Sequence, residues 1–108
     1  MTLQNFWIAE INKIGGFNKI INLLESLKRK VLKKETYHID TTIFYLNRIH
    51  YCNNISIETD FINNREDIIN RYIFYNGMAK KYNSKELNCI SESYLFCLNH
   101  CKRLRNIA

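Results

Sequence analysis

The sequence contains no proline and only three glycines, so it lacks the proline-, glycine- and serine-rich stretches that join separate domains. The glycines precede neither a G-K-[ST] nor a G-x-x-G pattern, which argues against a glycine-rich phosphate-binding loop. A chain of 108 residues can bury roughly two-thirds of its unfolded surface without a metal or a disulfide. We therefore expect one helical domain over residues 1–108 and no cofactor.

Long apolar runs and a secretory leader are also absent. The N-terminus has no basic leader ahead of an apolar run and no small-residue cleavage site, and no apolar run approaches ~18 residues. We expect a protein that is neither secreted nor inserted in a membrane and that resides inside the cell, in the reducing cytoplasm or nucleus. The cysteines are then expected to be free thiols. They are Cys52, Cys89, Cys97 and Cys101.

Apolar residues recur at helical spacing over residues 3–14 and 17–34, which predicts two helices. Gly15 and Gly16 separate them, because glycine enters a left-handed C-terminal cap without strain. Asp40 is expected to cap a third helix that continues through Tyr51. These features favour an all-α fold, a compact bundle of four to five helices.

Two more helices are expected in the second half of the chain. Asn64 can cap a helix whose Glu66 and Asp67 lie at the positive end of the dipole, and Asn76-Gly77 is expected to end or bend it. Ser84 can cap the last helix. The expected core residues are Trp7, Phe17, Ile21, Leu24, Leu46, Ile69, Ile73, Ile90, Tyr94 and Leu98.

Residues 43–60 allow an alternative. This stretch is rich in β-branched and aromatic residues, and Asn53-Asn54 could form a type I′ turn between two strands. A lone hairpin is marginal, so it would have to pack on the helices. The alternative fold class is therefore α+β with a small hairpin at residues 43–60.

The segment C-L-N-H-C-K-R-L-R near the C-terminus allows a metal site. Cys97 and Cys101 share a helix face and could bind zinc together with His50 and Cys52, or with His100. However, the sequence has no Cys-x-x-Cys knuckle, and both thiols fall in an apolar stripe. We expect Cys97 and Cys101 to be core residues, and a zinc-stabilised module is kept only as an alternative.

The sequence does not indicate an enzyme. Cys101 lies at a helix C-terminus, where the helix dipole opposes a thiolate, and the three histidines are isolated from one another. The paired acidic residues have no nearby base, and one pair is explained by a helix N-terminus. We therefore predict no catalytic residues and no catalytic activity.

The formal net charge of +6 is concentrated in three clusters, two of them at expected helix ends. Cations favour helix C-termini, so part of this pattern is structural. A basic cluster beside tyrosines such as Tyr37, Tyr82 and Tyr94 could also neutralise phosphates and stack a base. The candidate phosphate or partner contacts are Lys28, Arg29, Lys30, Lys33, Lys34, Lys80, Lys81, Lys102, Arg103 and Arg105.

Several large apolar residues fall off the expected core stripes, so we expect some of them to be exposed and to form a partner surface. They are Ile8, Phe44, Tyr45, Phe74 and Phe96. We predict a non-catalytic adaptor that docks onto a larger protein or ribonucleoprotein assembly. The alternative is an RNA- or ribosome-binding factor that uses the basic helix ends. The sequence does not define the oligomeric state.

Overall fold

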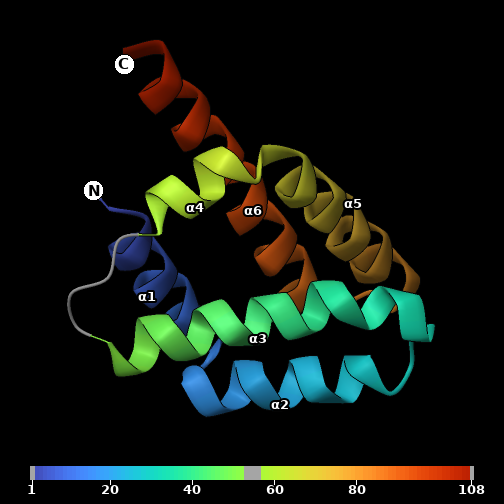
Figure 1. Cartoon of the computed structure of the whole chain (residues 1–108). Helices are drawn as coiled ribbons and strands as arrows, with labels where there is room; N and C mark the ends of the chain where they lie inside the picture. Colours follow the sequence, from blue (N-terminus) through green and yellow to red (C-terminus); the bar gives the residue numbers. More distant parts are fainter. Residues whose placement is uncertain (1, 53–56, 108) are drawn as a thin grey trace. The chain divides into compact units, whose positions relative to one another are not determined.

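The computed structural model describes residues 2–52 and 57–107, without the side chains of residues 58, 59 and 102–107. Six α-helices and one 3₁₀-helix account for most of these residues (Figure 1). No strand occurs in this part of the chain. The all-α class is confirmed, with one helix more than expected. The fold divides into two compact units, Gln4–Ile55 and Met1–Leu3 with Ser56–Ala108.

The unit Gln4–Ile55 contains α1 (Leu3–Ile14) from its second residue onward and α2 (Phe17–Lys28), and the glycine pair separates the two helices. Gly15 and Gly16 both have positive φ, +124° and +105°. The N–H of Gly15 donates to the carbonyl of Asn12, and the N–H of Gly16 donates to that of Ile11. This is the pair of hydrogen bonds of a Schellman motif, as the glycines predict.

The α2 helix ends earlier than its periodicity predicts, at Lys28. The N–H groups of Arg29 and Lys30 bond to carbonyls three residues back, which tightens the chain into a turn. A 3₁₀-helix, η1 (Lys33–Glu35), follows, and the Glu35 carboxylate accepts the N–H of Leu32 at 3.1 Å. The expected helix over residues 17–34 is therefore two helices joined by a hydrogen-bonded turn.

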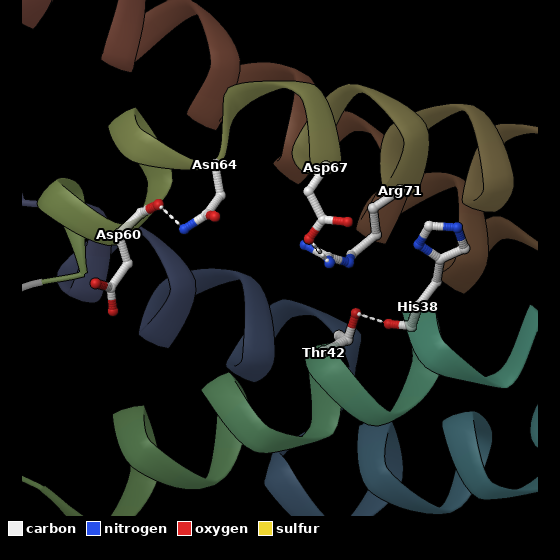
Figure 2. Close-up of polar contacts among 6 residues, drawn as sticks. All are labelled: His38, Thr42, Asp60, Asn64, Asp67 and Arg71. Atoms are coloured by element: carbon white, nitrogen blue, oxygen red, sulfur yellow. Dashed lines mark hydrogen bonds and ion pairs between the residues drawn. The ribbon is translucent and has the colours of Figure 1, made fainter.

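The α3 helix (Thr36–Tyr51) starts before Asp40, so the prediction of Asp40 as its N-cap is wrong. Its end at Tyr51 is confirmed. The hairpin alternative for residues 43–60 is also wrong, because residues 43–51 belong to α3 and residues 58–60 to α4. The expected Asn53-Asn54 turn lies outside the described residues. Thr42 is buried in α3, and its hydroxyl donates to the His38 carbonyl at 2.9 Å (Figure 2).

The second unit contains α4 (Glu58–Asn63), α5 (Arg65–Lys81) and α6 (Lys85–Ile107), and α5 packs along α6. Asn64 occupies the N-cap position of α5, but its side chain donates to the Asp60 carbonyl at 2.7 Å instead of capping (Figure 2). The helix passes through Gly77 without ending. Ser84 caps α6 as predicted, because its hydroxyl accepts the N–H of Leu87 at 3.1 Å.

A buried arginine organises the core of this second unit. The Arg71 side chain is 1% exposed, and it donates to the carboxylate of Asp67 one turn earlier on α5 (Figure 2). Its guanidinium lies 5.5 Å from the centre of the Tyr94 ring, which stacks on Tyr75. Burial lowers the pKa of Arg71, but its interactions with Tyr94 and Asp67 raise that pKa by more, so the group stays charged.

The expected core is confirmed at six positions: Trp7, Leu24, Leu46, Ile90, Tyr94 and Leu98. Phe17, Ile21 and Ile69 are only half-buried. The prediction of Ile73 as a core residue is wrong, because its side chain is 58% exposed. In its place α5 buries Arg71, Phe74 and Tyr75, so the inward face of the helix is rotated from the one that the pattern suggested.

Candidate interaction surface

Three exposed aromatic side chains lie along one face of α3. Tyr37, Phe44 and Tyr51 are 54%, 55% and 70% exposed. Residues seven apart differ by only about 20° in direction around an α-helix, so the three rings form a stripe about 21 Å long. The buried residues of α3, Ile39, Thr42, Leu46 and Ile49, lie on the opposite face. We call Tyr37, Phe44 and Tyr51 the aromatic face.

Neighbouring groups contact two rings of the aromatic face, Tyr51 and Phe44. Tyr51 meets the Phe17 ring edge-on at 5.7 Å, and Phe17 itself stacks on His50 at 4.0 Å with 3° between the planes. The Arg48 guanidinium lies 5.6 Å from the centre of the Phe44 ring. Because contacts of this kind restrict side-chain rotation, the rings lose less conformational entropy when a partner covers them.

Five cations gather at the α2–α3 connection, next to the start of the aromatic face. They are the predicted contacts Lys28, Arg29, Lys30, Lys33 and Lys34, which we call the basic turn. The sequence prediction placed them at the end of one helix, whereas the structure places only Lys28 inside α2 and the others in the turn and η1. Arg29, Lys30, Lys33 and Lys34 are exposed.

The basic turn has a fixed backbone. Besides the Glu35 bond to Leu32, the Thr36 hydroxyl donates to the Lys33 carbonyl at 2.7 Å. Lys28 forms an ion pair of 2.7 Å with Asp40 of α3, and the hydrogen bond from Lys28 to Asp40 raises the pKa of the Lys28 ammonium. Leu32 is 62% exposed within the turn, so an apolar side chain stands among the cations.

The remaining predicted contacts belong to the other unit. Lys80 and Lys81 are exposed at the end of α5, and Lys80 lines an open hollow beside the α5–α6 turn together with Lys85. Lys102, Arg103 and Arg105 lie in the last turns of α6, where the structure describes no side chains. The structure thus brings the first five predicted residues together in one segment of the unit Gln4–Ile55.

The predicted role of the tyrosines divides in the same way. Tyr37 is exposed beside the basic turn, and Tyr82 is exposed with the Lys81 ammonium 5.5 Å from its ring centre. The prediction that Tyr94 could stack a base is wrong, because its side chain is in the core and only 1% exposed. Of the apolar residues expected off the core stripes, Ile8 and Phe44 are exposed, whereas Phe74 is buried.

The cysteines are free thiols. Cys97 and Cys101 are fully buried, which confirms them as core residues, while Cys89 is half-buried and Cys52 is exposed. Among the side chains that the structure describes, no three His, Cys, Asp or Glu residues converge in a way that could hold a metal ion.

Sequence reasoning found parts of this surface but missed its pattern. It singled out Tyr37 beside the cations and Phe44 as off the core stripe, yet it passed over Tyr51 and Leu32. The signal was present as three aromatic residues at seven-residue steps. Because a heptad of rings also describes a buried seam, that spacing alone cannot separate an exposed face from a core face.

Comparisons with protein-family models, curated protein sequences and solved structures gave no match to this chain. In the described part of the chain, no helix combines the length and apolarity needed to cross a bilayer. Any functional conclusion therefore depends on the surface itself.

Proposed function

We propose that this chain is a non-catalytic adaptor that docks onto a larger protein or ribonucleoprotein assembly through the aromatic face of α3. The observation that carries this proposal is the exposure of Tyr37, Phe44 and Tyr51, each more than half exposed, in one row. Exposed rows of large apolar groups are a common mark of protein interfaces, where tyrosine and other aromatic residues are enriched.

The energetics of such a row fit docking. Aromatic side chains supply much of the binding energy at protein interfaces, and rings already held by neighbours cost less entropy to immobilise. The Phe17–His50 stack and the Arg48 guanidinium provide that restraint for Tyr51 and Phe44. The place of action that we propose is a reducing compartment inside the cell, where cysteines remain thiols.

Site-specific photocrosslinking in cells that express the chain tests the proposal. A benzophenone amino acid replaces Phe44 in one variant and Ile73, which is equally exposed on α5, in the control. We expect protein adducts at position 44 that are absent at position 73 and that survive nuclease treatment. Equal adducts at the two positions would contradict docking through α3.

A second candidate, an RNA- or ribosome-binding factor, is favoured by the basic turn lying directly before Tyr37. Lysine and arginine side chains neutralise phosphates while a nearby ring stacks a base. Salt separates the two functions, because counterion release weakens nucleic-acid binding steeply between ~50 and ~200 mM salt. An interface built mainly on apolar rings should respond far less. Adducts at position 44 that disappear with nuclease would favour this second candidate.

A further inference from the structure

The charge beside the aromatic face is uneven along its length. Tyr37 follows the basic turn, with Lys33 and Lys34 one helical turn before it. At the other end, residues 49–52, which surround Tyr51 in sequence, include no lysine, arginine, aspartate or glutamate. The surface therefore combines one strongly cationic end, a row of rings, and one uncharged end.

We propose that the aromatic face binds an amphipathic helix of a partner protein, whose carboxylates are gathered at the end that meets the basic turn. This inference rests on the proposed function and names the chemistry of its partner. The row of rings spans about 21 Å, the length of about four helical turns. A helix laid along α3 can place apolar side chains at three- and four-residue steps between rings that recur every seven residues.

Charge complementarity requires the carboxylates to come from the partner. Three acidic groups lie near the basic turn: Glu35 accepts the Leu32 N–H, Asp40 pairs with Lys28, and the charge of Glu25, one turn earlier on α2, also acts on Lys28. Between residues 28 and 37 the sequence has five cations and one carboxylate. A partner that brought a neutral or basic end to this position would leave those like charges unmatched.

A nucleic acid fits the same surface less well. A phosphate backbone needs cations along its whole path, but between Tyr37 and Tyr51 the sequence offers one, Arg48, whose guanidinium lies over the Phe44 ring. A second copy of the chain supplies no acidic cluster on its own aromatic face, so the pairing of two aromatic faces would leave the basic turn unmatched.

Selection from a random library of displayed 16-residue peptides tests the proposal on the full chain. Peptides are selected on the wild-type protein and counter-selected on the variant Phe44→Ala/Tyr51→Ala, whose folding is checked by circular dichroism. We expect the enriched peptides to carry apolar residues at i, i+3 or i+4 and i+7, with aspartate and glutamate concentrated at one end. A random RNA pool is selected in parallel on the same two proteins.

Binding of the enriched peptides is then measured with two matched lysine variants. Lys33→Gln/Lys34→Gln should weaken binding about three- to tenfold, since each lost ion pair at a solvent-exposed rim has a modest effect. Lys80→Gln/Lys81→Gln removes the same charge from exposed positions of the other unit and should leave binding unchanged.

The outcomes separate this inference from the proposed function. Peptides that require Phe44 and Tyr51 but show no acidic excess, or that bind the Lys33→Gln/Lys34→Gln variant equally well, overturn the acidic partner and leave the docking surface standing. A selection in which no peptide distinguishes wild type from Phe44→Ala/Tyr51→Ala overturns the docking surface as well. If the selection enriches RNA that binds wild type but not Phe44→Ala/Tyr51→Ala, and enriches no peptides with that preference, the surface binds nucleic acid and the inference is overturned.

Discussion

Replacing Asp67 by alanine should destabilise the protein strongly, because it leaves the Arg71 guanidinium buried without its carboxylate. The Arg71 side chain is 1% exposed, whereas the Asp67 side chain is 31% exposed. Removing one partner of a fully buried ion pair costs about 3 to 5 kcal/mol. Because water reaches Asp67 in the folded state, we expect a smaller loss of unfolding free energy, about 2 to 3 kcal/mol.

Glu66 provides a matched control for the Asp67 variant. It is also an acidic residue in the first turn of α5, but its side chain is exposed. Glu66→Ala removes the same charge from the same helix end, where its interaction with the dipole contributes about 0.3 to 1 kcal/mol. The difference between the two variants therefore reports the Arg71 interaction rather than the loss of a negative charge.

The assay is urea and thermal unfolding of both variants, followed by far-ultraviolet circular dichroism. For a chain of this size, 1 kcal/mol corresponds to about 4 °C in Tm, so Asp67→Ala should lower Tm by about 8 to 12 °C. Glu66→Ala should lower it by no more than about 4 °C. Equal losses in the two variants would refute the account of Arg71 as a core charge held by Asp67.

Three further predictions concern local structure. Gly15→Ala should destabilise the protein by about 1 to 2 kcal/mol, because Gly15 has φ +124°. Gly77→Ala should be neutral or stabilising, because Gly77 lies inside α5 with open space around it. Thermal unfolding of both variants measures these two changes in stability. Ser84→Ala should cost about 1 kcal/mol through loss of the α6 cap, as measured by urea unfolding; an unchanged midpoint would contradict the cap. The raised pKa of Lys28 means that its pairing with Asp40 stabilises the fold fully below pH 10.5, and this stabilisation is lost as pH rises through the folded-state pKa. Stability measured from neutral to strongly alkaline pH should therefore fall more in wild type than in Asp40→Asn, and parallel curves would contradict the pairing.

The helices that the sequence predicted well are those with a local signal at an end. The glycine pair ends α1, and the Ser84 hydroxyl starts α6, because both devices act on hydrogen bonds within a few residues. The burial of Cys97 and Cys101 followed from their place in an apolar stripe. Such features need no knowledge of the rest of the fold.

The misplaced boundaries had no such signal. Nothing between Lys28 and Thr36 is a glycine or a proline, so the end of α2 could not be recognised, and the turn depends on hydrogen bonds made by Glu35 and Thr36. In residues 43–51, β-branched and aromatic residues left a strand open as the alternative to the expected helix, but helix packing overrode that weak preference. Gly77 is tolerated within α5 for the same reason.

The core of the second unit and the candidate surface required the structure. Arginine is rarely fully buried, so nothing in the pattern identified Arg71 as a core residue, although Asp67 four positions earlier was a hint. The aromatic face was half predicted, through Tyr37 and Phe44. Its continuity with Tyr51 appeared only once the buried side of α3 was known.

Hydroxyl-radical footprinting of the protein alone and in complex with a selected peptide tests the docking surface most directly. Hydroxyl radicals label aromatic side chains in proportion to their exposure. We predict that Tyr37, Phe44 and Tyr51 are labelled in the free protein and protected in the complex, while Ile73 and Tyr82 are labelled equally in both. Unchanged labelling of the three rings, with protection appearing at Ile73 or Tyr82 instead, would contradict the account.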